Sequence, residues 1–173
     1  MVSTDLKQPA ELPHSKQPTR EQQRWMFVVC ALNRPGTLTA AAAVFSNRGI
    51  SLEGFLGSGI DTSTEEDGRL LFSFRATPQK QALLKRSLQR LPSIFNVDAY
   101  TYDDPKLRAI AIAKLVPTAD VDTTSAVHTE IVVRNDTSYL LMLTGSTTAV
   151  ESAIAHLRQQ QQIQDVVMSA ITV

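Results

Sequence analysis

The amino-acid sequence predicts an α+β fold made of two small domains in tandem. Apolar runs typical of strands alternate with segments of helical spacing, first over residues 25–104 and again over residues 105–173. The second series repeats the first at an interval of about 70 to 80 residues, and each half alone would have only a marginal core. Residues 1–24 are polar, contain three prolines and lack periodicity, which predicts a disordered polar tail.

A central strand and a sharp turn open the first domain. Residues 25–32 are apolar at both sets of alternate positions, as is typical of a strand covered on both faces. Residues 33–36 read Asn-Arg-Pro-Gly, and the fixed φ of proline predicts a tight turn there. Helical spacing follows over residues 37–48, and Gly49 ends it. One apolar stripe of this helix is expected to face the sheet. It contains Leu38, Ala41, Ala42 and Phe45.

Two strands joined by a polar hairpin tip come next. Residues 50–60 form the first strand, loosened by three glycines, and residues 61–68 form the tip. In residues 69–76, apolar side chains occupy every second position, which predicts a half-buried strand. Phe72 and Phe74 fall on its buried side.

A second helix and a last strand complete the first domain. Thr77 is placed to cap the helix, and Pro78 suits its first position. The basic residues of this helix are expected to face solvent. Its apolar face contains Leu84, Leu88 and Leu91. With a strand at residues 94–102, the order is β-α-β-β-α-β, the ferredoxin-like pattern.

The second domain repeats this order with its first helix reduced or missing. A strand is predicted at residues 107–115, but residues 116–127 show no helical stripe. Residues 130–133 and 139–143 form a predicted hairpin. A helix with one apolar face and a strand at residues 163–173 follow.

Composition and charge argue against several classes of function. Lys and Arg together number 17, as do Asp and Glu, so the net charge is zero and a role on nucleic-acid phosphates is disfavoured. RNA-recognition modules share the strand order, but the two phenylalanines of residues 69–76 fall on the apolar side, which favours core positions. No apolar run approaches the ~20 residues of a membrane span, and the N-terminus lacks the apolar core of a signal peptide. We therefore expect a soluble cytoplasmic protein without a membrane or nucleic-acid partner.

Residues that could carry chemistry are sparse. The three histidines lie far apart in the sequence, no metal-ligand spacing occurs, and no phosphate-binding loop is present. We therefore expect no catalytic residue, no metal and no cofactor. The single cysteine, Cys30, lies in the first apolar strand and is expected to be a small core residue.

The turn at residues 33–36 is the best candidate for a binding site. The first amides of the helix that follows have no partners within it, and the helix dipole adds partial positive charge there. Such a place can hold a small anion, for example the carboxylate of an amino acid. The alternative is a Pro-Gly turn that holds no ligand.

The motifs around this turn resemble a known family. The sequence Asn-Arg-Pro-Gly-Thr-Leu, then a helix, then Phe-Ser-Asn-Arg-Gly-Ile-Ser-Leu-Glu is similar to the first ACT domain of the small regulatory subunit of acetolactate synthase (acetohydroxyacid synthase). The likeness continues at residues 108–115 and 141–166. It implies an ACT domain at residues 25–104 and a second, truncated ACT-like domain at residues 105–173.

The resemblance implies an amino-acid sensor in branched-chain amino-acid biosynthesis. A branched-chain amino acid such as valine would bind where two first domains meet in a homodimer. The chain would be non-catalytic and would exert allosteric feedback on the catalytic large subunit of a thiamine-diphosphate-dependent acetolactate synthase. The implied ligand contacts are Asn33, Arg34, Gly36, Thr37 and Leu38 of one chain, with Ser51 and Leu52 of its neighbour.

Three features differ from the family's pattern. Ser51 stands where the family has Asn, which shortens or removes one side-chain amide contact. The first helix of the second domain is reduced, and residues 1–24 precede the usual start. An alternative hypothesis is an orphan ACT module that dimerises and binds protein while its ligand pocket has decayed.

Overall fold

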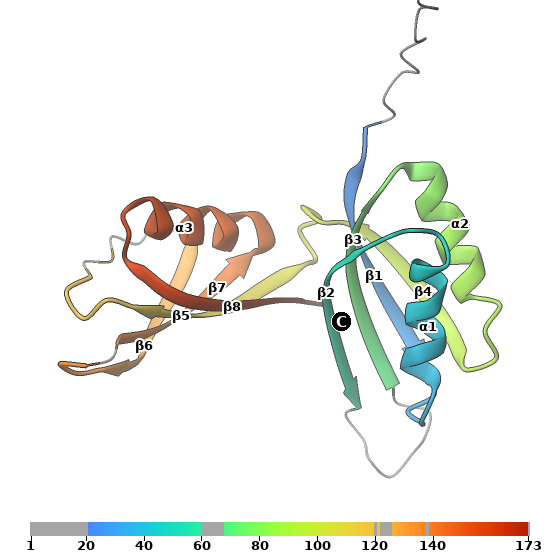
Figure 1. The fold of residues 1–173 in the computed structure, drawn as a ribbon, viewed down its shortest axis with the longest axis horizontal. Helices are drawn as coiled ribbons and strands as arrows, with labels where there is room; N and C mark the ends of the chain where they lie inside the picture. The colour runs from blue at the N-terminus through green and yellow to red at the C-terminus, as the bar shows by residue number, and fades with distance from the viewer. Residues whose placement is uncertain (1–20, 60–67, 120, 122–125, 138, 173) are drawn as a thin grey trace, which may run out of the picture.

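Each half of the protein forms a four-stranded antiparallel sheet with its helices on one face (Figure 1). The computed structural model describes residues 21–59, 68–119, 121, 126–137 and 139–172. Most of the predicted tail and nearly all of the predicted hairpin tip lie outside the described residues.

The first sheet has the strand order β2-β3-β1-β4. Its domain consists of β1 (Gln23–Ala31), α1 (Thr37–Ser46), β2 (Leu52–Gly59), β3 (Gly68–Ala76), α2 (Pro78–Leu88) and β4 (Ile94–Thr101). The central position predicted for the first strand is confirmed, because β1 pairs with both β3 and β4. The strand begins at Gln23, so Arg24 belongs to β1 and not to the predicted tail.

The second sheet has the strand order β6-β7-β5-β8, which matches the first sheet strand for strand. Its domain consists of β5 (Arg108–Leu115), β6 (Val127–Arg134), β7 (Tyr139–Ser146), α3 (Thr147–Gln159) and β8 (Ile163–Ile171). In the described residues, no helix lies between β5 and β6. The α+β fold of two ferredoxin-like units, the second lacking its first helix there, is therefore confirmed.

Four phenylalanines fill the core between the first sheet and its two helices. Their side chains are at most 1% exposed, and neighbouring ring centroids lie 4.8 to 6.2 Å apart. Aromatic pairs at such distances stabilise a core by about 0.5–1.5 kcal/mol beyond the burial of their area. The four are Phe27, Phe45, Phe72 and Phe74. The core positions predicted for Phe72 and Phe74 are confirmed.

The stripe predicted for α1 is wrong at one end. Leu38 is 41% exposed, whereas Thr37 and Val44 are buried beside Ala41 and Phe45. The buried face is therefore rotated by one residue at the first turn of the helix. The cause is the left-handed conformation of Gly36, which sets the direction in which the helix leaves the turn.

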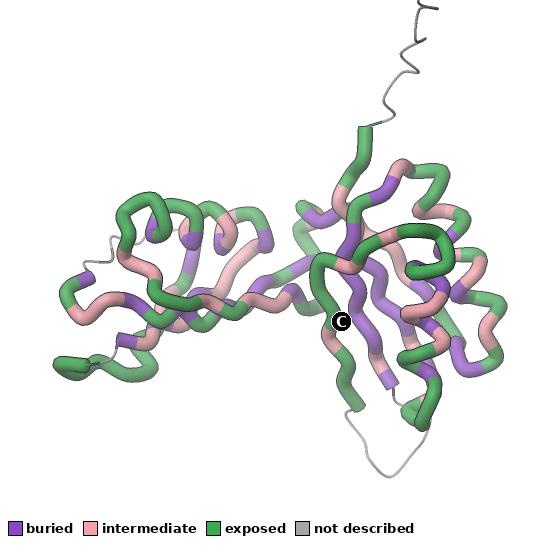
Figure 2. Tube along the Cα trace, viewed as in Figure 1, coloured by how far each residue is buried: buried purple, intermediate pink, exposed green. Residues whose placement is uncertain are grey.

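The predicted half-burial of the third strand is also wrong, because β3 is covered on both faces. Leu71 and Ser73, on the side away from the helices, are buried as well. Figure 2 shows this burial along the central strands of the first sheet. Cys30 on β1 is only partly buried, so the prediction that it is a core residue is wrong.

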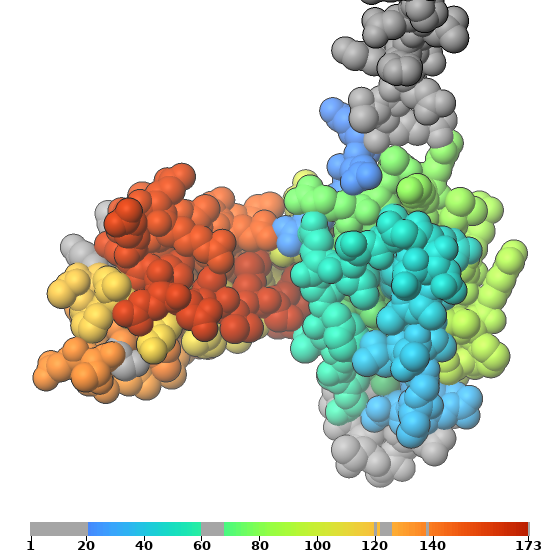
Figure 3. All heavy atoms as spheres, in the orientation of Figure 1, coloured from blue at the N-terminus to red at the C-terminus, as the bar shows by residue number. Residues whose placement is uncertain are grey.

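The second face of the first sheet is covered by a seam between the domains. The seam is a buried cluster of Met26, Val28, Leu71, Tyr102, Leu107 and Ala170. Three of these residues lie on β1 and β3, two on the segment that joins the domains, and Ala170 on β8. Figure 3 shows the C-terminal residues packed against the side of the first domain that carries β2. The two domains therefore share an apolar contact.

Candidate functional site

The turn before α1 leaves two helix amides without a protein acceptor. Gly36 is the N-cap, with a φ of 89°, and no side chain caps the helix. The N–H of Thr37 donates to the carbonyl oxygen of Arg34 at 3.3 Å. In the described part of the chain, the N–H groups of Leu38 and Thr39 meet no acceptor. They lie at the positive end of the helix dipole and so form a place for an anion.

The other two helices are closed by their own side chains. Thr77 Oγ1 accepts a hydrogen bond from the N–H of Lys80 at 3.4 Å at the start of α2, as the sequence predicts. Ser146 Oγ accepts one from the N–H of Ala149 at 3.3 Å at the start of α3. Only α1, among the described helices, begins without such a cap.

A cavity of about 310 Å³ lies beside this uncapped end. This volume is at the lower limit of small-molecule sites. The cavity is formed by the end of β1, the turn, the first residues of α1, the second half of β2 and the start of β3. Its lining residues are Ala31, Leu32, Asn33, Arg34, Thr37, Leu38, Phe55, Gly57, Ser58, Gly59, Gly68 and Leu70.

One buried hydroxyl at this site has no partner. Thr37 is 6% exposed, and its Oγ1 makes no hydrogen bond within the described residues. An unpaired buried hydroxyl typically costs about 1–3 kcal/mol of stability. Thr37 also lines the cavity, so the helix start combines two free amides with an unpaired hydroxyl.

Glycines bring the walls of the cavity close to the turn. A Cβ added at Gly59 would lie 2.3 Å from Nδ2 of Asn33, and one added at Gly68 would lie 2.6 Å from the carbonyl oxygen of Ala31. Neither position has room for a side chain without a shift of its neighbours. Gly59 therefore lets the end of β2 pack against the Asn33 side chain.

Two exposed apolar side chains belong to the lining of the cavity. Leu38 and Phe55 both line it, and they are 41% and 44% exposed. Phe55 belongs to β2, an edge strand that pairs only with β3. The exposed strand edge and the two exposed apolar side chains lie on the same part of the surface.

The structure brings together four of the seven predicted contact residues. Asn33, Arg34, Thr37 and Leu38 line the cavity, and Gly36 supplies the N-cap beside it. Ser51 and Leu52 lie elsewhere, at the C-terminal end of α1, where Leu52 packs against the first core. Within one chain they do not reach the cavity.

Sequence reasoning missed the wall that β2 contributes. Phe55, Gly57, Ser58 and Gly59 all line the cavity. The signal was present, because glycines at closely spaced positions inside a strand often mark a close backbone approach. What the pattern lacked was the pairing register that sets Gly59 against Asn33.

The described residues offer no metal centre and no membrane-spanning helix. No group of three or more His, Cys, Asp or Glu side chains is placed to hold a metal ion in the part of the chain that the structure describes. None of the described helices combines the length and the apolar character that a membrane crossing requires.

The fold resembles that of solved structures of known proteins. The small subunit of acetolactate synthase from Thermotoga maritima matches with a TM-score of 0.66 and 17% sequence identity, over 87% of this chain and 98% of that chain. The regulatory subunit of aspartate kinase from Thermus thermophilus in its ligand-free form matches with a TM-score of 0.46 and 11% identity, over 79% and 92%. This second likeness is too weak to carry an argument.

At the level of sequence the chain stands apart. No protein-family model matches it, and curated protein sequences give no match. The identity of 17% to the Thermotoga protein shows a shared fold and nothing finer. The chain therefore has two ferredoxin-like domains in tandem, and its fold resembles that of the acetolactate synthase small subunit from Thermotoga maritima.

Proposed function

We propose that this protein is a non-catalytic regulatory subunit that binds a branched-chain amino acid at a dimer interface. The single observation that carries the proposal is the uncapped start of α1, which opens beside a small cavity lined in part by the exposed side chains of Leu38 and Phe55. A free amino acid has a carboxylate for the amides and, in the branched-chain series, an apolar side chain for Leu38 and Phe55.

The ligand would be held by three kinds of contact. Its carboxylate accepts hydrogen bonds from the N–H groups of Leu38 and Thr39, supported by the helix dipole. Asn33 lines the cavity, and its side-chain amide contacts the carboxylate or the ammonium group. The apolar side chain packs between Leu38 and Phe55.

A second copy of the chain would complete the site. β2 is an edge strand, so two copies can pair their β2 strands antiparallel around a two-fold axis. Antiparallel pairing sets the start of one β2 beside the end of the other. The Ser51 and Leu52 end of one chain then approaches the Gly59 end of its partner, where the cavity lies.

The regulated enzyme would be the catalytic large subunit of acetolactate synthase. The support is the fold likeness, which extends over 98% of the small subunit from Thermotoga maritima. To regulate, the amino acid must bind more tightly to one state of the complex than to the other, typically by 1–3 kcal/mol. The catalytic chain would supply the thiamine-diphosphate chemistry, and this protein would supply the amino-acid response.

Isothermal titration calorimetry with valine, leucine and isoleucine tests the binding. The sharpest variant is Leu38→Asp, which puts a carboxylate at the cavity beside the proposed ligand carboxylate without altering the left-handed Gly36. The matched control is Leu83→Asp, because Leu83 is also an exposed helical leucine of the first domain and does not line the cavity.

We expect wild type and Leu83→Asp to bind at least one of the three amino acids, and Leu38→Asp to lose the heat of binding. No heat at millimolar concentrations with any of them in the wild type would contradict the sensor. If such a chain still dimerised and captured the catalytic subunit, the alternative of an interaction module with a decayed pocket would replace it.

A further inference from the structure

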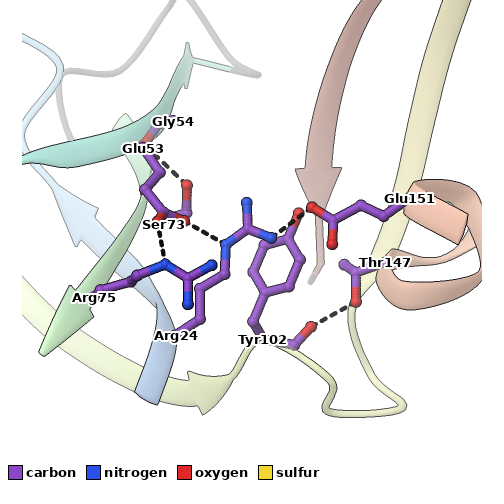
Figure 4. Close-up of polar contacts among 8 residues, drawn as sticks. All are labelled: Arg24, Glu53, Gly54, Ser73, Arg75, Tyr102, Thr147 and Glu151. Atoms are coloured by element: carbon purple, nitrogen blue, oxygen red, sulfur yellow. Dashed lines mark hydrogen bonds and ion pairs between the residues drawn. The ribbon is translucent and has the colours of Figure 1, made fainter. Parts of the chain in front are cut away.

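A cluster of charged side chains links the two domains beside the apolar seam (Figure 4). Arg24 of β1 extends from the first sheet toward α3, and its Nη1 donates to Oε1 of Glu151 at 2.5 Å. The same guanidinium forms an ion pair with Glu53 through Nε, without the alignment of a hydrogen bond. One arginine therefore joins β2 of the first domain to a helix of the second.

Tyr102 forms the base of this cluster. The guanidinium carbon of Arg24 lies 3.5 Å from the centroid of the Tyr102 ring. The N–H of Tyr102 donates to the carbonyl oxygen of Arg24 at 3.0 Å, and its own carbonyl accepts from Oγ1 of Thr147 at 2.5 Å. Because Thr147 is the first residue of α3, the segment between the domains is tied to both.

These contacts favour the ionised form of Arg24 and the neutral form of Tyr102. Burial lowers the pKa of Arg24, but the hydrogen bond to Glu151 and the neighbouring charges outweigh this and leave the pKa above its ordinary value. Burial also raises the pKa of Tyr102 to about 12, against the opposing effect of Arg24. At neutral pH, Arg24 is a cation over a neutral ring.

Glu53 is placed to respond to events at β2. It lies at a register shift between Leu52 and Gly54, where the ladder to β3 is interrupted. Such a bulge changes the direction of a side chain. Here the carboxylate meets Arg24 and also Arg75, whose Nε donates to Oε1 at 2.6 Å. Glu53 therefore has two arginine partners, and it can keep both or release Arg24 while retaining Arg75.

We propose that Arg24 is a positioning residue that sets the orientation of the second domain relative to β2, and that it passes a change at β2 to α3. The proposal rests on the proposed function for its ligand, since Glu53 directly follows Ser51 and Leu52. Binding or dimerisation at that end of β2 moves Glu53. This movement changes the ion pair between Glu53 and Arg24. The hydrogen bond from Arg24 to Glu151 then changes as well.

Distances between spin labels on the two domains test this directly. Arg86→Cys on α2 and Arg158→Cys on α3 provide the label sites, in a Cys30→Ala background and diluted with unlabelled protein to remove distances between copies. The test variant is Glu151→Gln, which removes the second-domain charge and lies outside the proposed ligand site. The control is Glu130→Gln, an exposed carboxylate on β6 of the same domain.

Without ligand, we expect one narrow distance distribution in wild type and in Glu130→Gln, and a broadened or shifted one in Glu151→Gln. Arg24→Lys should behave like Glu151→Gln, because an ammonium group does not match two carboxylates as a guanidinium fork does. An unchanged narrow distribution in both variants would overturn the proposal. Thermal unfolding of each variant checks that it is folded.

Repeating the distance measurements with valine distinguishes a failure of this proposal from a failure of the proposed function. We expect valine to shift the wild-type distribution, to leave that of Glu151→Gln unshifted, and to bind Glu151→Gln with an affinity altered roughly fivefold or more. Binding to wild type without any shift would overturn the coupling and spare the sensor. If wild type bound no amino acid, the sensor would fail, and the ligand-free comparison would still decide the role of Arg24.

Discussion

Two buried threonines occupy the same place in different helices and should respond oppositely to the same substitution. Thr37 is the first residue of α1 and Thr147 the first of α3, and both are buried. Oγ1 of Thr37 has no partner within the described residues, whereas Oγ1 of Thr147 donates to the carbonyl oxygen of Tyr102 at 2.5 Å. Valine has nearly the same shape as threonine and lacks the hydroxyl.

The expected magnitudes follow from these contacts. Thr37→Val removes an unpaired buried hydroxyl, so the free energy of unfolding of the ligand-free protein should rise by about 1 kcal/mol or more. Thr147→Val leaves the Tyr102 carbonyl oxygen without its donor, so the free energy of unfolding should fall by about 1–3 kcal/mol. A change of 1 kcal/mol corresponds to roughly 2–4 °C in Tm for a chain of this size.

Urea unfolding followed by circular dichroism measures both variants under one set of conditions. Each threonine serves as the control for the other, because the cost of a β-branched residue at the first helical position is common to both. A loss of stability in Thr37→Val equal to that in Thr147→Val would show that the Thr37 hydroxyl is already satisfied. The helix start beside the cavity would then offer two unpaired polar groups, the N–H groups of Leu38 and Thr39, instead of three.

Three further predictions concern the core, the cavity wall and the joint between the domains. Leu88→Ala should cost about 2–5 kcal/mol in urea unfolding because Leu88 is fully buried, and exposed Leu83→Ala should cost under about 0.5 kcal/mol; equal costs would contradict the helix orientation. Gly68→Ala should cost roughly 1–3 kcal/mol, since its Cβ would meet the Ala31 carbonyl oxygen at 2.6 Å, and a neutral effect would place β3 farther from the turn. One tyrosine, Tyr102, should ionise near pH 12 in an ultraviolet titration of the folded protein, and Tyr102→Phe should remove that step. Because its folded pKa lies above the unfolded value of 10.0, its contribution of roughly 2–3 kcal/mol holds below pH 10 and is lost as pH rises from about 10 to 12.

Most of the fold could be predicted from local patterns. Apolar periodicity, with Pro and Gly at the ends of the segments, predicts α1, α2 and α3. Residues 25–32 are apolar at both sets of alternate positions, which indicates the central strand. The repeat of strand order in the second sheet follows from the repeat of those patterns. These signals are local, so they survive even where the sequence shares little with its structural relatives.

Burial by the other domain could not be predicted. Leu71 alternates with core residues, a pattern that predicts a solvent-facing side chain, yet the seam covers it. The sequence pattern placed Arg24 at the end of a polar tail, yet Arg24 belongs to β1 and joins the two domains. Both errors arise because the contacts that bury these residues lie far away in the sequence.

The candidate site was predictable in its turn and not in its walls. Asn33, Thr37 and Leu38 follow from the turn and the helix start. The contribution of Phe55 and Gly59 depends on how β2 pairs with β3 and approaches the turn. The places of Ser51 and Leu52 depend on a second copy of the chain, and so they stay a prediction.

The most direct test of the central idea follows individual amide signals by nuclear magnetic resonance during a valine titration. The ¹⁵N–¹H resonances of Leu38 and Thr39 should move in a saturable way, because their N–H groups receive the ligand carboxylate. Those of Lys80 and Ala149, which already donate to the caps of α2 and α3, should stay in place. If the Leu38 and Thr39 signals stayed fixed while valine bound, the amino acid would bind elsewhere, and the start of α1 would be an ordinary turn.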